Sequence, residues 1–241
     1  MDIVKIALYE RSVMLKAMIF VDGSWFDSAV REFCHQTRRG RIFVENLDYR
    51  AIWHHVTAEL ESAFNFPIDL VRVYWAAGRP DPKTVGPKSL KSAQRIEAGW
   101  QKIGRLPGVN VETYPYNYGG LEFESVDETA EPERRENGAD GNRHDMRRPP
   151  TEKCVDVALA TKMLYFAAIP GAYDIGVLLT GDGDFAPVLK AVRDLGKRTA
   201  LAIVGGIPSV AESMRGDVAM GTLLDMAPID LRSFLQEQNP R

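Results

Sequence analysis

Cysteine is almost absent from this sequence of 241 residues, which contains only Cys34 and Cys154. Two cysteines cannot supply a disulfide framework or a thiolate zinc site, and they fit a reducing compartment. The four histidines have no metal-ligand spacing, and none is placed with a serine or cysteine as a nucleophile dyad would be. Gly-rich phosphate loops and the dinucleotide fingerprint are missing too. These absences disfavour disulfide scaffolds, zinc enzymes and nucleotide-cofactor chemistry.

Long apolar runs and an excess of basic charge are also lacking. No run approaches the roughly 18 residues that cross a membrane, and the first residues lack the order of a signal peptide, so we expect a cytoplasmic protein. The net charge of -3 means that any contact with nucleic acid has to come from a local basic patch. A hydrophobic content of 45% with 26% charged residues predicts an ordinary globular core.

The periodicity of apolar residues predicts alternating strands and helices. The predicted strands span residues 17–22, 68–76, 109–114, 174–180 and 198–204, and the predicted helices span 24–36, 48–62, 87–104, 152–167, 184–195 and a short segment from about 208. Several strands are rich in β-branched and aliphatic residues, as expected where helices cover both faces of a sheet. The sequence therefore predicts an α/β fold with a mostly parallel, doubly wound sheet.

We expect one main domain at residues 17–225, preceded by an extension at 1–16 and followed by a C-terminal helix and tail at 226–241. Residues 115–150 interrupt the alternation with a long polar stretch, which is either a lid that serves the functional site or a solvated insertion without a role. The tail carries a short amphipathic segment at 227–235. It packs either on the core of the domain or on a second copy of the chain, which would make a homo-oligomer.

Four aspartates fall where such a sheet would gather them. Asp22 ends the first predicted strand, Asp182 and Asp184 follow the strand at 174–180, and Asp156 lies in the first turn of the helix between them. Ligands of open parallel sheets bind beyond the carboxyl ends of the strands, where the chain order reverses. Carboxylates collected there repel one another and lose hydration, so they imply a cation.

Oxygen ligands alone are typical of hard cations, which here predicts Mg²⁺ or Mn²⁺ and hydrolysis of a phosphate ester by a metal-activated water. Each aspartate also has a simpler interpretation. Asp22 and Asp182 fit turn residues, Asp184 fits the cap of the helix that follows it, and Asp156 fits an exposed residue that complements the helix dipole. The joint placement at two strand ends and a helix start favours the metal site.

Three segments carry a family resemblance: Ile-Phe-Val-Asp-Gly-Ser at 19–24, Lys-Cys-Val-Asp-Val-Ala-Leu-Ala at 153–160, and the stretch at 173–188 that continues into Leu-Gly-Lys at 195–197. Over residues 17–225, without the insertion, the chain resembles the NYN family, whose nuclease-like domains are related to PIN domains and include LabA-like bacterial proteins. The resemblance implies a PIN-like three-layer α/β/α fold and a Mg²⁺- or Mn²⁺-dependent ribonuclease. It matches Asp22, Asp156, Asp182 and Asp184 to the acidic metal-binding positions of the family.

Two positions depart from that family pattern. Trp25 stands where the family usually has an asparagine, and Cys154 stands where it often has a glycine. Trp25 is either a core residue at the start of a helix or a platform on which a base stacks at the rim of the pocket. The first departure puts one polar substrate or metal contact in doubt, but the acidic set is complete.

Candidate substrate contacts are Lys153, Ser24 and Thr180. Lys153 is close to Asp156 in the chain and would bind a phosphate of the scissile strand, and the two hydroxyls would donate to phosphate oxygens. A helix N-cap is the alternative for Ser24. The basic groups at 38–41 and 147–148 are further candidates, although most surface cations serve only as solvated charges.

The leading hypothesis is a metal-dependent endoribonuclease that acts on RNA, with DNA as the alternative substrate. A second hypothesis, prompted by Trp25, is a non-catalytic RNA-binding or regulatory protein that retains the acidic pocket. A phosphatase of the haloacid dehalogenase kind is disfavoured, because that family needs an aspartate where this chain has Ser24.

Overall fold

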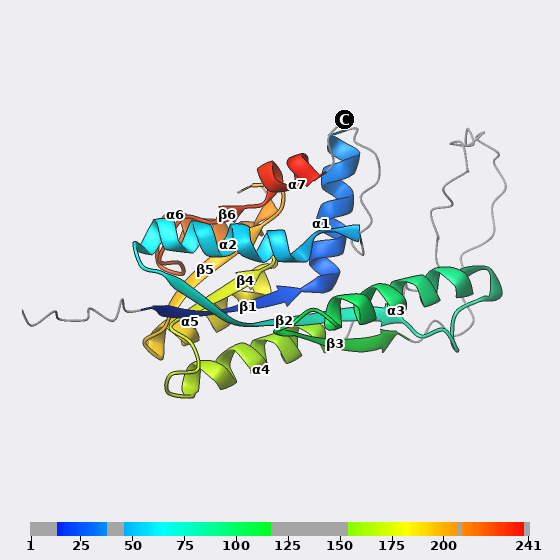
Figure 1. The fold of residues 1–241 in the computed structure, drawn as a ribbon, viewed down its shortest axis with the longest axis horizontal. Coiled ribbons are helices and arrows are strands. Elements are labelled where there is room, and N and C mark those ends of the chain that lie inside the picture. The colour runs from blue at the N-terminus through cyan, green and yellow to red at the C-terminus, as the bar shows by residue number, and fades with distance from the viewer. Residues whose placement is uncertain (1–13, 38–45, 117–153, 207–208, 239–241) are drawn as a thin grey trace, which may run out of the picture.

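A six-stranded sheet forms the centre of the protein (Figure 1). The computed structural model describes residues 14–37, 46–116, 154–206 and 209–238. The strand order is β3-β2-β1-β4-β5-β6, and every pair is parallel, which confirms the predicted sheet. The strands are β1 (Leu15–Asp22), β2 (Ile68–Pro80), β3 (Val109–Tyr116), β4 (Ile175–Leu179), β5 (Arg198–Ile203) and β6 (Ile229–Asp230).

The predicted helices are all present, with shifted boundaries. They are α1 (Gly23–Gln36), α2 (Tyr49–Phe64), α3 (Leu90–Gly104), α4 (Val155–Ala168), α5 (Ala186–Asp194) and α6 (Glu212–Ala219), with a further helix α7 (Arg232–Gln238) in the tail. Short 3-10 turns, η2 (Pro87–Ser89) and η3 (Gly183–Phe185), precede α3 and α5. The helices predicted from 87 and 184 therefore begin with a tighter turn, and those predicted from 152 and from about 208 begin three and four residues later than expected.

Helices cover both faces of the sheet and make two separate cores. Along β1, Ile19 and Val21 point into the first core, whereas Met18 and Phe20 point into the second, as the two-residue period of a strand requires. Side chains of α1, α2, α3 and α7 complete the first core, and side chains of α4, α5 and α6 complete the second. The predicted three-layer α/β/α architecture is therefore confirmed.

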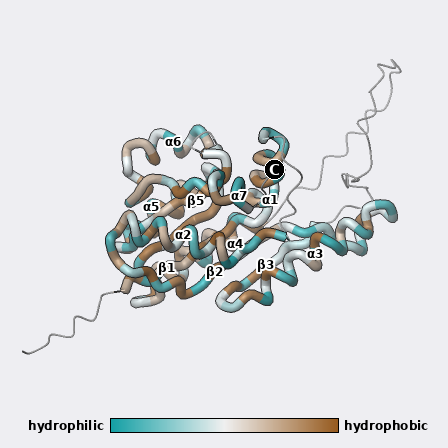
Figure 2. The backbone as a smooth tube through the Cα atoms, turned by 45° about the horizontal axis from the view of Figure 1, so that its top comes forward, coloured by the Kyte–Doolittle hydropathy of each residue, from teal (hydrophilic) through white to brown (hydrophobic). Residues whose placement is uncertain are grey.

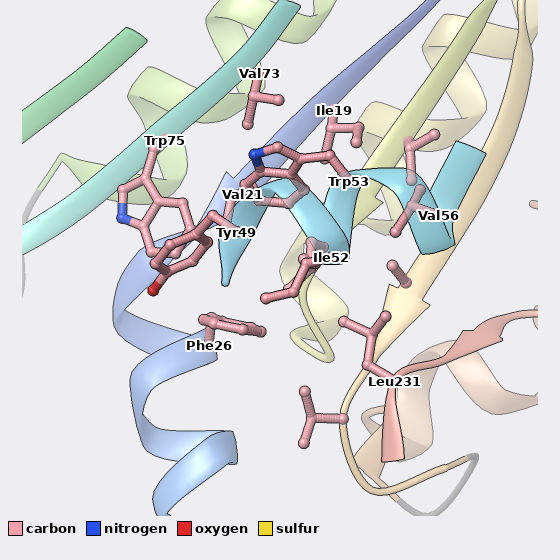
Figure 3. Packing of buried hydrophobic residues seen from close by; sticks show 14 of the residues in the cluster. Ile19, Val21, Phe26, Tyr49, Ile52, Trp53, Val56, Val73, Trp75 and Leu231 are labelled. Atoms are coloured by element: carbon pink, nitrogen blue, oxygen red, sulfur yellow. The ribbon is translucent and has the colours of Figure 1, made fainter. Parts of the chain in front are cut away.

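Aromatic side chains fill the part of the first core that lies under the start of α1 (Figure 3). Trp75 of β2 makes edge contacts with Tyr49 and Phe26, with ring centroids 5.2 Å and 5.7 Å apart. Trp53 and Trp100 pack around the same indole. Edge-to-face pairs of this kind contribute beyond their buried area, so this cluster fixes how α1 leaves the sheet.

The C-terminal tail belongs to the first core. Leu231 and Leu235 are fully buried, which confirms that the tail packs on the domain. Sequence periodicity did not reveal β6, because a strand of two residues has no measurable period. Figure 2 shows the hydropathy of each residue along the backbone, with the strands more apolar than the surface helices.

Several predicted features involve residues outside the described ranges. Most of the N-terminal extension, nearly all of the insertion, Lys153 and the basic groups at 38–41 and 147–148 lie outside the described residues. Within the described ranges, none of the helices combines the length and the apolar character needed to cross a membrane.

Candidate active site

The chain order reverses between β1 and β4. From β1 the chain moves outward through β2 and β3, then returns to place β4 on the other side of β1. In open α/β sheets this reversal opens a crevice at the carboxyl ends of the two central strands. The register pairs Val21 with Leu179, so the next residues, Asp22 and Thr180, lie side by side at this edge.

A chain of hydrogen bonds joins the two strand ends. The Thr180 hydroxyl donates to Oδ2 of Asp22 at 3.1 Å, and the backbone N–H of Asp182 donates to the same hydroxyl oxygen at 3.2 Å. Thr180 is fully buried and Asp22 is only 4% exposed. Thr180 therefore holds the acidic residue of one strand in a fixed position relative to the loop of the other.

Asp22 has a second role in the fold. Its Oδ1 accepts the backbone N–H of Trp25 at 2.9 Å, which makes Asp22 the N-cap of α1. The simple interpretation of Asp22 as a capping or turn residue is thus correct, and it does not compete with the site because the other carboxylate oxygen faces Thr180. Ser24 is not the N-cap. Its hydroxyl accepts the backbone N–H of Gly78 at 2.9 Å and so ties α1 to β2.

Asp182 and Asp184 lie in the turn after β4 and differ in exposure from Asp22. Oδ1 of Asp182 accepts the backbone N–H of Asp184 at 3.0 Å, a local bond that starts η3. Asp182 is half-buried and Asp184 is exposed. Asp184 does not cap α5, since the residue at that cap is Phe185 and it makes no side-chain cap bond. The carboxylate of Asp184 is therefore not used as a helix cap.

Two glycines of this turn pack closely against the segment that leads into α6. A Cβ on Gly181 would lie 2.3 Å from the carbonyl oxygen of Ser209, and one on Gly183 would lie 2.1 Å from Oγ of Ser213. The backbone N–H of Ala211 also donates to the Gly181 carbonyl at 2.8 Å. The glycines of the Gly-Asp-Gly-Asp pattern thus reflect close packing against residues 209–213, a segment that the sequence pattern did not connect with the site.

Trp25 lies over the same turn. It is half-buried, packs against hydrophobic residues of both cores, and its Cζ2 would be 2.7 Å from a Cβ on Gly181. Gly23 makes a comparable approach, since a Cβ there would meet Nε1 of Trp75 at 2.1 Å. The core interpretation of Trp25 therefore has direct support, and stacking on a base stays a prediction.

Asp156 is carried by the first turn of α4. The preceding residue, Val155, is buried in the same core as Phe185 of η3, and α4 packs against η3. Asp156 itself is exposed. Cys154 has a φ of 77°, a left-handed conformation that glycine adopts without strain, which fits the glycine often found at that position in the resembling family.

The structure brings the predicted residues together in part. Asp22, Asp182 and Asp184 are linked at two adjacent strand ends, and Asp156 lies on the helix that packs against their turn. In the described ranges, however, no group of three or more His, Cys, Asp or Glu residues is arranged to hold a metal ion.

A groove lies elsewhere on the sheet. It has a volume of about 710 Å³ and lies between α3 and the edge strand β3, where its lining includes Arg79, Glu97, Trp100, Arg105 and Thr113. None of the four aspartates lines it. The hydrogen-bonded carboxylates lie instead at the switch point of the sheet, where open α/β folds bind ligands.

These features define an α/β/α domain with an acidic switch point. The chain belongs to the NYN domain family, whose model matches residues 16–218. The family is part of the PIN-like nuclease superfamily, whose members generally use divalent metals, so membership supports a nuclease function and a nucleic-acid substrate. No curated protein matches the chain.

A similar solved structure is that of a protein of unknown function from Vibrio parahaemolyticus RIMD 2210633. The two chains are 17% identical, the match covers 90% of this chain and 93% of that one, and the TM-score is 0.44. Likeness at this level carries no functional conclusion.

Proposed function

We propose that this NYN-domain protein is a ribonuclease that hydrolyses RNA phosphodiester bonds at the carboxyl edge between β1 and β4, with Mg²⁺ or Mn²⁺ as the cofactor. The observation that carries the proposal is the bond from Thr180 to Asp22, together with the bond from the Asp182 N–H to Thr180. A buried hydroxyl that holds two acidic segments together is more than turn chemistry requires. It is what a preorganised acidic site requires.

The donor set fits a hard divalent cation, because it consists of carboxylate oxygens with no sulfur or imidazole nitrogen. The residues that would hold the ion are Asp22, Asp156, Asp182 and Asp184. When bound, such an ion lowers the pKa of a coordinated water and neutralises charge that develops on the phosphate.

The residues of the chain then have distinct tasks. Asp22, fixed by Trp25 and Thr180, provides a carboxylate that does not move. Asp182 is half-buried and Asp184 is exposed, so in this proposal the substrate reaches this turn more readily than the buried Asp22. Thr180 is fully buried, so we assign it a positioning role and not direct contact with substrate.

Two further residues bind substrate in this proposal. Lys153, three positions before Asp156, would bind a phosphate of the scissile strand. Ser24 lies two residues after Asp22, where its hydroxyl accepts the N–H of Gly78, and in this proposal it contacts a phosphate oxygen of the substrate.

The test is cleavage of a panel of single-stranded and structured RNAs and DNAs with Mn²⁺, Mg²⁺ or EDTA. We expect metal-dependent cleavage of RNA that Asp182→Asn reduces by about a hundredfold or more, as loss of a group needed in the transition state does. Asp194→Asn is the matched control, because Asp194 is an exposed aspartate at the end of α5, and it should leave the rate unchanged. Full activity of Asp182→Asn, with its unfolding temperature unchanged, would reject the proposal.

A second candidate is a non-catalytic RNA-binding protein that retains the acidic edge. It is prompted by Trp25, which stands where the resembling family usually has an asparagine and which packs against hydrophobic residues of both cores. This candidate predicts salt-sensitive RNA binding with no turnover at any metal concentration. The same panel separates the two, since intact RNA with retained binding would select the second.

A further inference from the structure

One flank of the molecule projects beyond the acidic edge. β1 ends at Asp22, opposite Ala76, whereas β2 continues through four more residues to Pro80, paired with Thr113 to Tyr116 of β3. Four residues of strand extend about 13 Å. We call this projection, with residues 81–89 and α3, the wing; α3 and the end of β3 extend past the arrowhead of β1 in Figure 1.

The wing stands next to the site. Gly78, in its projecting part, donates its N–H to Ser24, which lies two residues after Asp22. Any strand of nucleic acid that leaves the site on this side has to pass over the wing.

The wing is basic in a chain that is slightly acidic overall. Residues 79–105 contain seven basic and two acidic residues, whereas the whole chain contains 30 basic and 33 acidic ones. One of the two acids, Glu97, pairs with Arg79 at 3.5 Å on the flank that faces β3. The basic residues are Arg79, Lys83, Lys88, Lys91, Arg95, Lys102 and Arg105.

Spacing places four of these cations on one face. Lys88, Lys91, Arg95 and Lys102 recur at three, four and seven residues, so they form a stripe along α3 and the turn before it. All four are exposed, and the buried Ala93 and Trp100 fall on the opposite side of the helix. Cations one helical turn apart are separated by about 5.4 Å, a spacing comparable with that of successive phosphates in a strand.

The simpler explanation for such a stripe is a solvated helix face. On other surface helices of this protein, basic residues are accompanied by acidic ones. On α5, Lys190 and Arg193 alternate with Asp194, and on α2, Arg50 is balanced by Glu59 and Glu61. α3 has a single acid for its several bases. Among its own residues α3 therefore has an excess of positive charge, and such an excess beside an acidic site favours a polyanion that the aspartates alone would repel.

We propose that the wing binds the phosphate backbone of the single RNA strand and leads it past Ser24 to the acidic edge. Lys91 and Arg95 contact successive phosphates on the outer face of α3. Arg79 and Arg105, which line the groove of about 710 Å³ on the β3 side, bound the path on its other flank. This inference rests on the proposed function, since it names the surface by which that substrate is held.

The experiment measures binding of a fluorescein-labelled single-stranded RNA by anisotropy in EDTA, across a series of salt concentrations. Lys91→Glu/Arg95→Glu is compared with Lys190→Glu/Lys197→Glu, which makes the same change in net charge on and just after α5. The wing variant should bind about tenfold more weakly or worse, and the slope of log K against log salt should fall by about 1.4, since each phosphate contact on a single strand contributes about 0.7. The control should keep the wild-type slope.

An unchanged slope in the wing variant, or an equal loss in the control, would overturn the inference. So would a wing variant that binds single-stranded RNA normally and loses only duplex binding. The proposed function fails separately. If the wild-type protein does not cleave RNA but its binding shows the wing-dependent salt slope, the nuclease is refuted and the wing is supported. If the wild-type protein cleaves RNA with a metal and the wing variant binds RNA normally, the nuclease is supported and the wing is refuted.

Discussion

The two strand ends that meet at the candidate site are built differently. At the end of β1, Asp22 is 4% exposed and both of its carboxylate oxygens accept hydrogen bonds, one from the backbone of α1 and one from Thr180. At the end of β4, Asp182 is half-buried, Asp184 is exposed, and their one shared bond is local to the turn. The first end supports the fold as well as the site, and the second end is open to a ligand.

The largest expected effect is on the β1 end. Asp22→Ala removes the N-cap of α1, at about 0.5–2 kcal/mol, and leaves the buried Thr180 hydroxyl without its acceptor, at about 1–3 kcal/mol. We expect it to lower the free energy of unfolding by about 3 kcal/mol, measured by urea denaturation. Asp184→Ala, at the open end, should change it by less than about 0.5 kcal/mol, while both variants lose cleavage. Equal stability of the two variants would remove the contrast.

The tight turn after β4 provides a second test. Gly181→Ala places a methyl group 2.3 Å from a backbone oxygen of Ser209, so the start of α6 has to shift, and we expect a loss of about 1–3 kcal/mol. Gly216→Ala is the matched control. Nothing lies within 4 Å of a Cβ there, and the position is inside α6, so it should stabilise by about 0.5–1 kcal/mol. Thermal unfolding of both variants would show opposite signs, and the same sign in both would contradict this account of the turn.

A smaller effect is expected where α4 begins. Cys154 has a φ of 77°, and Cys154→Gly relieves that strain, so we expect a gain of about 1 kcal/mol in the free energy of unfolding. Because the backbone already has the conformation that glycine prefers, Asp156 should stay in place and cleavage should persist. Loss of stability in Cys154→Gly, measured by urea denaturation, would show that the cysteine side chain contributes more than its backbone strain costs.

The smallest effect concerns a pair away from both strand ends. The hydrogen bond from Lys162 lowers the pKa of Glu112, and the same bond raises the pKa of Lys162. The stability that Glu112 contributes is present above its unfolded pKa of about 4.3 and is lost as pH falls through its lower pKa in the folded protein. The stability that Lys162 contributes is lost only as pH rises through its raised pKa in the folded protein.

Lys162→Met should therefore destabilise by less than about 1 kcal/mol at pH 7, because the pair is partly exposed, and the difference from wild type should close in acid. Thermal unfolding at pH 7 and near pH 3 measures both values. A larger loss than that from Asp22→Ala would contradict the view that the buried strand end dominates local stability.

Periodicity and punctuation were sufficient to predict most of the fold. The runs at 17–22 and 174–180 predicted adjacent acidic strand ends because parallel strands place their carboxyl ends at one edge, and the register bears this out. Periodicity could not predict β6, which is too short, or the cap at Asp22, which depends on the conformation of one residue. The basic excess of residues 79–105 was countable in the sequence, but without the fold there was no reason to connect it with Asp22.

The sequence alone determined the alternation of strands and helices, the two cores and the four acidic positions, because these depend on residue type at a fixed local period. Only the tertiary structure decided that a buried threonine joins two strand ends and that two glycines allow the segment before α6 to pack closely. It also decided that β2 and β3 extend past the site and carry the basic wing. Such features depend on register and on contacts between residues far apart in the chain, which no local pattern records.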